Sequence, residues 1–201
     1  MAARSQIAVC ILAGGKSRRF GGNKALADWD GQPLIAHVLS RIRSQTDGPV
    51  AINAADPHLF DDLGVPVLVD EAWLGAGPLA GIRSALLWAK KQRLHEVVTV
   101  GVDLPFLPAD YLQTLGAQGA PTTVSSNGRC HPINGLWGVT HLSELETYLE
   151  SGKRAAHGRT ELCEAAVAVF ALDSDRVDSF FNVNSVHDLK VAKALNRLTR
   201  Q

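Results

Sequence analysis

The feature that most constrains this chain of 201 residues is a continuous apolar run, Ile7 to Leu12, that leads directly into a glycine-rich basic stretch. An uninterrupted apolar run of this length is typical of a strand buried on both faces. The stretch from Ala13 to Lys24 contains four glycines and four Lys or Arg residues. Glycine lets backbone N–H groups approach a ligand closely, and cations offset phosphate charge. The combination favours a phosphate-binding loop over a solvated basic turn.

Two common phosphate-binding motifs do not fit the spacing of this loop. A Walker A motif needs a glycine five residues before its Gly-Lys-Ser, and that position is Cys10. A dinucleotide motif that begins at Gly14 would need glycines where Lys16 and Arg19 stand. A dinucleotide-dependent oxidoreductase is therefore the least favoured reading of the loop.

The apolar pattern alternates between two periods along the rest of the chain. Apolar or β-branched runs predict strands over 49–53, 66–70, 97–102, 122–125, 133–139 and 166–172. Helical spacing of apolar residues predicts helices over 34–45, 79–92, 108–115, 141–151 and 186–199. Such alternation predicts an α/β fold with a mostly parallel sheet covered by helices on both sides. Because neither a repeat nor a long linker interrupts the pattern, we expect one domain over residues 1–201.

Charge and cysteine content exclude several classes of protein. Twenty Lys and Arg residues balance twenty Asp and Glu residues, so no global field attracts the chain to nucleic acid or to an anionic membrane. The cysteines, Cys10, Cys130 and Cys163, have the spacing of neither a zinc ribbon nor a disulfide framework. The first apolar run is too short for a signal peptide or a membrane span. We therefore expect a cytoplasmic protein that binds neither nucleic acid nor membrane.

The loop Leu12-Ala-Gly-Gly-x-x-x-Arg19-x-Gly-Gly, followed by Lys24, resembles the signature loop of the molybdenum cofactor guanylyltransferase family. Further motifs follow in that family's order: Asn53 at the end of an expected strand, Asp70, Gly77-Pro-Leu-Ala-Gly-Ile82, Asp103 in Gly-Val-Asp-Leu-Pro-Phe, His131-Pro132 before an expected strand, and Phe181-Asn-Val-Asn184. The chain departs from the family's pattern at Gly21-Gly22-Asn23-Lys24, which is one residue shorter and lacks the aspartate that precedes the lysine.

The resemblance implies a Rossmann-like nucleotidyltransferase fold of the glycosyltransferase-A type, in three αβα layers. It implies transfer of GMP from GTP to the terminal phosphate of molybdenum-bound molybdopterin, with Mg²⁺ as cofactor and pyrophosphate as leaving group. Residues from about 7 to 115 would bind GTP, and residues from about 116 to 191 would bind the acceptor. Cofactor-insertion proteins and molybdoenzymes are the candidate protein partners.

Carried over residue by residue, the resemblance assigns roles to particular side chains. Lys24, Arg19 and Asp103 would be catalytic, with the cations on the phosphates and Asp103 on Mg²⁺ at the carboxyl end of a strand. The residues that would bind GTP are Leu12, Ala13, Gly14, Gly15, Lys24, Asn53, Asp70, Gly77, Pro78 and Asp103. Asn53 and the backbone of Leu12 to Gly14 would read guanine. Asn182 and Asn184 would line the acceptor side, pointing the same way along a short strand, with Asn184 as a second candidate metal ligand.

Other interpretations stay open beside this one. A sister enzyme could transfer CMP to the molybdenum cofactor or a nucleotide to a sugar phosphate. In a different class, a non-catalytic nucleotide-binding adapter could deliver the cofactor. His131 and His157 are candidate bases, although a lone histidine is more often a structural hydrogen-bonding group. The four tryptophans are expected to pack in the interior rather than to stack on a pterin.

Overall fold

The computed structural model describes residues 6–15, 20–70, 73, 77–156, 158, 163–171 and 177–198. Its central element is a seven-stranded sheet of order β5-β4-β1-β6-β8-β7-β9. The strands in that order are β5 (Val67–Leu68), β4 (Val50–Asn53), β1 (Ala8–Leu12), β6 (Glu96–Gly101), β8 (Arg129–Gly138), β7 (Thr122–Ser126) and β9 (Ala166–Phe170). Only β8 runs antiparallel to its neighbours in this sheet. The prediction of a mostly parallel sheet is confirmed.

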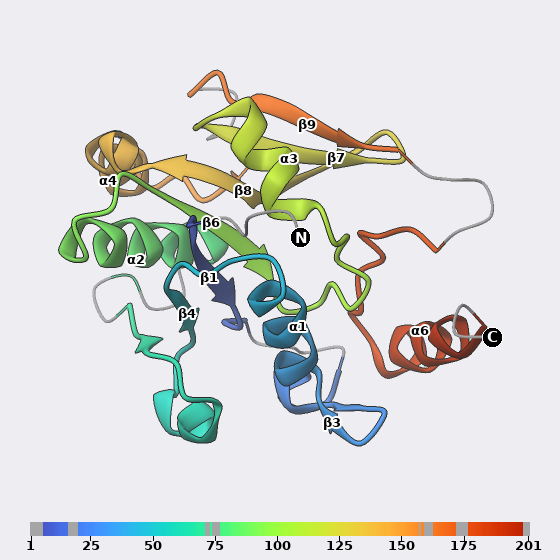
Figure 1. Cartoon of the computed structure of the whole chain (residues 1–201). Coiled ribbons are helices and arrows are strands. Elements are labelled where there is room, and N and C mark those ends of the chain that lie inside the picture. Colours follow the sequence, from blue (N-terminus) through green and yellow to red (C-terminus); the bar gives the residue numbers. More distant parts are fainter. Residues whose placement is uncertain are drawn as a thin grey trace.

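Helices cover both faces of this sheet (Figure 1). The helices α1 (Leu34–Arg43) and α3 (Tyr111–Gln118) bury apolar side chains against one face. The helices α2 (Pro78–Lys91) and α4 (Leu142–Glu150) bury theirs against the other. Side chains alternate across a strand, so Val9 and Ile11 of β1 enter the first core and Ala8 and Cys10 the second. The expected three-layer arrangement is confirmed.

The last helix, α6 (Val186–Leu198), lies apart from the sheet, near α1 and the hairpin of β2 (Asp28–Trp29) and β3 (Gln32–Pro33) (Figure 1). A small core of Trp29, Leu34, Val183 and Ala192 joins these elements. This packing holds the segment before α6 against the sheet. The backbone N–H of Val183 donates to the carbonyl of Asp103, with 2.9 Å between the heavy atoms.

Three local expectations are wrong. Residues 181–184 form no strand, because the Val183 bond is a single contact rather than a ladder. The helix expected from Pro108 begins at Tyr111, since turns at 105–106 and 109–110 precede it and the Pro108 carbonyl accepts from the N–H of Tyr111 and from Nε2 of Gln45. The pair His131-Pro132 lies inside β8 rather than before it. The turn at Asn127-Gly128, with φ of 48° and 70°, lets β8 begin at once.

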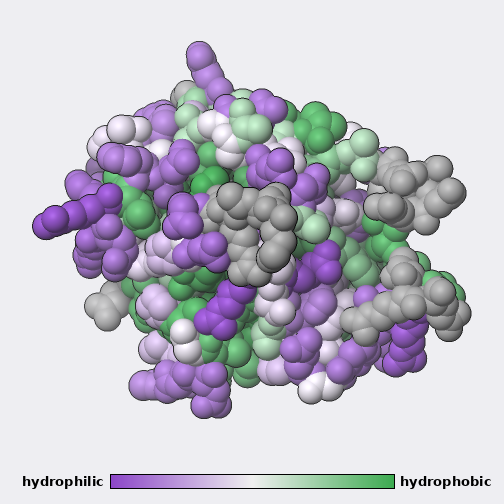
Figure 2. Space-filling model, viewed as in Figure 1, coloured by the Kyte–Doolittle hydropathy of each residue, from purple (hydrophilic) through white to green (hydrophobic). Residues whose placement is uncertain are grey.

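Hydrophilic residues cover most of the described surface on the face shown in Figure 2, and hydrophobic residues are exposed there in separate patches. Most large apolar side chains are instead taken up by the cores on the two sides of the sheet. The described helices include none with both the length and the apolar character needed to cross a membrane.

Candidate active site

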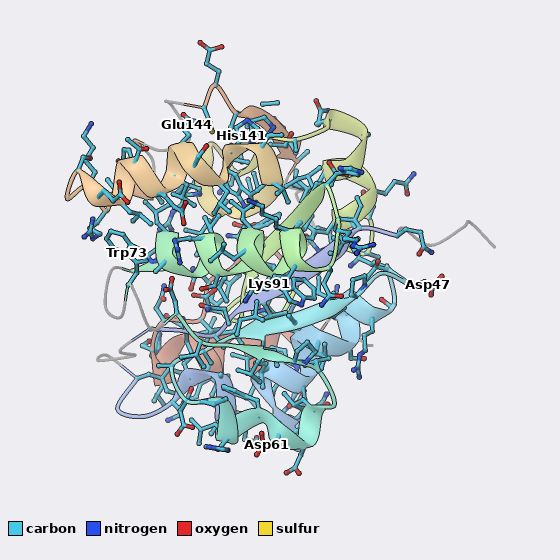
Figure 3. All side chains as sticks on the ribbon, turned by 90° about the vertical axis from the view of Figure 1, so that its left-hand side faces the viewer. Asp47, Asp61, Trp73, Lys91, His141 and Glu144 are labelled. Carbon is cyan, nitrogen blue, oxygen red and sulfur yellow. The ribbon has the colours of Figure 1, made fainter. Side chains whose placement is uncertain are left out.

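The candidate site lies where β4, β1 and β6 end side by side. Leu12 is in register with Asn53 on one side and with Gly101 on the other, so the three carboxyl ends are level. Ligands bind at this edge in open parallel sheets. Figure 3 shows both edges: Trp73, which follows β5, lies on the side of the strand ends, and Asp47, which precedes β4, lies on the opposite side.

The backbone at the start of the glycine-rich loop holds the three strand ends together. The N–H of Ala13 donates to the carbonyl of Asn53, 2.9 Å away, and the carbonyl of Leu12 accepts from the N–H of Val102, 3.2 Å away. These groups therefore extend the sheet by one residue. The glycines that follow, Gly14-Gly15, are exposed and are the part of this segment open to a ligand.

The ammonium of Lys24 brings together two residues that are far apart in sequence. Its Nζ donates to Oδ2 of Asp103 at 2.7 Å and lies 3.5 Å from Oδ1 of Asn184. Asp103 follows β6, and the backbone bond from Val183 to Asp103 brings Asn184 to the same place. The side chains of Lys24 and Asp103 are 15% and 16% exposed, so the pair is largely shielded from water but still reachable.

The residue before the lysine has a structural role. Lys24 begins a short 3₁₀ turn, Lys24–Leu26, and Oδ1 of Asn23 accepts a hydrogen bond from the N–H of Ala25 at 3.0 Å. Asparagine caps such turns as well as aspartate does. In this chain Asn23 therefore caps the turn that begins with Lys24.

The oxygen atoms around Lys24 fit a magnesium ion. Oδ2 of Asp103 and Oδ1 of Asn184 both face the one cationic position that the ammonium takes. Apart from these two ligand atoms, Oδ1 of Asn182, two residues before Asn184 in the chain, is buried without a hydrogen-bond partner among the described residues. Those residues contain no cluster of three or more acidic, His or Cys side chains. Mg²⁺ needs none, because it is commonly held by one or two carboxylates, waters and substrate phosphates.

Two residues that the sequence reasoning missed shape the position of Asp103. A Cβ atom on Gly101 would lie only 2.5 Å from Oδ1 of Asp103. The N–H of Gly101 donates to Oδ1 of Asn134, a side chain on β8 that is 4% exposed, at 2.8 Å. The sequence did hold a signal for Gly101, because this glycine ends a β-branched run, and a glycine in a strand often marks a place where another group approaches the backbone closely. Nothing in the sequence pointed to Asn134.

The two polar groups of the Asn53 side chain have different surroundings: the amide nitrogen is hydrogen-bonded, and the amide oxygen lies close to Gly14 and Gly81. Its Nδ2 donates to the carbonyl of Leu68 at 3.1 Å. Its Oδ1 lies 3.7 Å from the position of a Cβ on Gly14 and 2.7 Å from that of a Cβ on Gly81. A side chain at position 81 would push against the amide, so glycine is needed there for the close approach of α2.

Three further candidates for GTP binding, Asp70, Gly77 and Pro78, follow Asn53 in the chain. Gly77 precedes α2 with φ of 81° and ψ of −163°, a conformation that favours glycine, and Pro78 opens the helix. The first N–H groups of such a helix are suited to phosphate. Oδ1 of Asp70 accepts from the N–H of Trp73 at 3.2 Å, so this carboxylate also closes a turn.

Two predicted residues, Arg19 and His157, lie outside the described part of the chain. His131 is buried, and its ring centroid lies 5.0 Å from that of Phe180. Burial lowers the pKa of His131, and the charge of Arg129 lowers it further against the opposing effect of nearby carboxylates. The imidazole is therefore neutral near pH 7 and packs as part of the sheet face.

The tryptophans follow the expectation of interior packing. Trp88 and Trp137 are buried in the core under α2 and α4, and Trp29 is buried in the small core beside α6. Trp73 is half-buried, and the guanidinium of Arg154 lies 5.3 Å from its ring centroid.

A cavity of about 490 Å³ lies at the opposite edge of the sheet. It is lined by residues that precede β4 and β5 and end α2, among them Thr46, Pro49, Pro66 and Gln92. None of the predicted site residues lines it. We therefore place the candidate site at the carboxyl ends of the strands and not in this cavity.

Comparison with known proteins identifies the family of this chain. The family model described as the MobA-like NTP transferase domain matches residues 9–166. A molybdenum cofactor guanylyltransferase of Rhizobium leguminosarum bv. trifolii is 40% identical over 199 residues, which cover 94% of this chain and 93% of that protein. A protein of the same name from Acidiphilium cryptum is 37% identical over 194 residues, with 94% and 95% covered. The crystal structure of molybdopterin-guanine dinucleotide biosynthesis protein A from Archaeoglobus fulgidus has the same fold, with a TM-score of 0.71, 23% identity, and 97% of this chain and 100% of that chain covered.

Proposed function

The chain belongs to the MobA-like NTP transferase family, and we propose that it transfers GMP from GTP to the terminal phosphate of molybdenum-bound molybdopterin. The products are molybdopterin guanine dinucleotide and pyrophosphate. The observation that carries the proposal is the meeting of Lys24 with Asp103 and Asn184, which are 79 and 160 residues away, at the level ends of the strands. Cofactor-insertion proteins and molybdoenzymes are the proposed recipients of the product.

The chemistry requires two anions to meet, so neutralisation and alignment of charge carry most of the rate. Lys24 and Arg19 offset the charge of the nucleotide phosphates. Asp103, with Asn184, holds Mg²⁺, which when bound adds positive charge beside the phosphate oxygens. An oxygen of the acceptor phosphate attacks the α-phosphorus, and the bond to pyrophosphate breaks with its electron pair on the leaving oxygen. No base is required, because the attacking phosphate is already an anion.

Recognition of the nucleotide base is assigned to Asn53 and the loop after β1. Since Nδ2 of Asn53 is bonded to Leu68, the group that faces the loop is Oδ1, an acceptor. Guanine offers N1–H and N2–H₂ donors to such an acceptor. Residues from about 7 to 115 form the donor half in this proposal, with Asp70, Gly77 and Pro78 along the nucleotide. The acceptor half extends from about 116 to 191 and includes Asn182 and Asn184.

The test is a panel of nucleoside triphosphates with molybdenum-bound molybdopterin. We expect GTP to raise the Tm in the presence of Mg²⁺ and to yield pyrophosphate at least ~10 times faster than CTP or ATP, since one lost buried hydrogen bond costs about 1–3 kcal/mol. A preference for CTP would assign the chain to the sister reaction. Binding of GTP without any pyrophosphate would favour the delivery adapter instead.

A second prediction concerns the glycine next to the catalytic carboxylate. We expect Gly101→Ala to slow transfer about tenfold, a loss of about 1.4 kcal/mol of transition-state stabilisation, because the new methyl group displaces the Asp103 carboxylate. The matched control is Gly116→Ala in α3, whose methyl group would meet only the terminal methyl of Ile7, at 3.1 Å. Equal activity of the two variants in initial-rate assays would contradict the role of Gly101.

A further inference from the structure

An ion-paired network links α2 and α4 to Asp70, in the segment that follows β5. Arg83 of α2 is 16% exposed and lies between two carboxylates. Its Nη2 lies 2.7 Å from Oε1 of Glu146 on α4, and its Nε donates to the same oxygen at 2.9 Å. Its Nη1 lies 3.7 Å from Oδ1 of Asp70. The two helices lie side by side on one face of the sheet, with Trp73 at one end of α2 (Figure 3).

The carboxylate of Asp70 has one oxygen engaged and one without a partner. Oδ1 accepts from the N–H of Trp73 and faces Arg83. Oδ2 is buried and has no hydrogen-bond partner in the described part of the chain, and the side chain as a whole is only 9% exposed. A buried polar atom without a partner is costly. Because a carboxylate only accepts, Oδ2 is suited to an N–H or O–H donor of a ligand.

The position of Asp70 indicates which donor that is. Leu68 of β5 is in register with Asn53 of β4, so Asp70, two residues later, lies beside the base-reading asparagine at the same edge. The hydrogen-bond donors of GTP are the N1–H and N2–H₂ groups of guanine and the two ribose hydroxyls. The guanine donors are assigned to Asn53 and the loop. The ribose hydroxyls remain for Asp70.

We propose that Arg83 is a positioning residue that holds Asp70 for the ribose of GTP, and that Glu146 fixes Arg83 in turn. The inference rests on the proposed function and adds to it a determinant of ribose recognition. The guanidinium is planar, so two of its nitrogens bind Glu146 while a third faces Asp70. The ribose takes no part in bond breaking. Its contact is the same in the ground state and the transition state, and its loss therefore raises KM and leaves kcat unchanged.

The test compares GTP with 2′,3′-dideoxy-GTP in steady-state transfer and in binding by calorimetry. For Arg83→Gln we expect KM for GTP to rise about tenfold, equivalent to one hydrogen bond to a charged group, with kcat within about twofold of wild type. Wild type should bind dideoxy-GTP about tenfold more weakly than GTP, and Arg83→Gln should bind both alike. Glu146→Gln should give a smaller change in the same direction. Arg43→Gln, an exposed arginine at the other edge of the sheet, is the control and should behave as wild type.

The reference variant is Asp70→Asn, because Arg83 acts through Asp70. Combining Arg83→Gln with Asp70→Asn should weaken GTP binding no further than Asp70→Asn alone. A lower Tm for Arg83→Gln with unchanged discrimination between GTP and dideoxy-GTP would mean that Arg83 only braces α2 against α4, and would overturn the proposal. So would a fall in kcat at constant KM. If wild type prefers another nucleotide or transfers none, the proposed function fails. In that case the role of Arg83 is still decided by binding: the Kd of the nucleotide that wild type prefers is compared with the Kd of its dideoxy form, in wild type and in Arg83→Gln.

Discussion

Replacing Asp103 with asparagine is expected to slow nucleotide transfer by roughly a thousandfold or more, equivalent to about 4 kcal/mol of transition-state stabilisation. Asparagine has nearly the same shape, so the substitution removes the negative charge at the end of β6 and little else. Without that charge, Asn184 remains as a neutral oxygen donor beside Lys24 and holds Mg²⁺ weakly. Single-turnover pyrophosphate release with saturating GTP and a titration of Mg²⁺ would measure the loss.

The control for this prediction is Asp110→Asn, a change of an exposed carboxylate in the same connection between β6 and α3. It should keep the activity of wild type. Both variants should keep the circular dichroism spectrum of the folded protein. Mg²⁺-dependent activity of Asp103→Asn within tenfold of wild type would show that another carboxylate serves the metal.

For Lys24→Met we expect kcat to fall about 100- to 1,000-fold, the range seen when one preorganised donor to a developing charge is removed. Methionine keeps the length and the apolar contacts of the lysine stem. It carries no charge, so it cannot bind the phosphate oxygens as their geometry changes during transfer, which the flexible ammonium can do. Lys24→Arg should recover part of the rate, since it restores the charge with a different shape. A kcat for Lys24→Met within threefold of wild type would exclude a catalytic role for this lysine.

The same variant tests the pairing of Lys24 with Asp103. In the absence of nucleotide, Lys24→Met leaves a largely buried carboxylate without its cation, which costs on the order of 1–3 kcal/mol of stability. Adding Asp103→Asn should restore stability, as measured by urea unfolding, without restoring activity. The control is Lys193→Met, which breaks the pair with Asp28, whose side chain is 65% exposed. Its activity should not change.

Local patterns predicted the strands of the main sheet and the helices that cover it, although not the short hairpin of β2 and β3. A strand buried on both faces needs apolar residues at every position, as in Ile7 to Leu12, and α1 and α2 need them on one side only. These requirements act over a few residues, so periodicity reveals them. Two of the errors are local shifts of an element boundary, at Tyr111 and at the Asn127-Gly128 turn, and the third lies where a distant contact holds the backbone. At Val183 a single backbone bond to Asp103 joins the segment to the end of β6 without making a strand.

The sequence by itself determined the α/β layers and the family to which the chain belongs, and it predicted a phosphate-binding loop after β1. Only the tertiary structure decided that Lys24, Asp103 and Asn184 meet, that Gly101 leaves room for a carboxylate, and that Arg83 lies between Asp70 and Glu146. The physical reason is the range of the interactions. Side-chain periodicity is set by neighbours along the chain, whereas these contacts depend on strand register and helix packing between segments tens of residues apart.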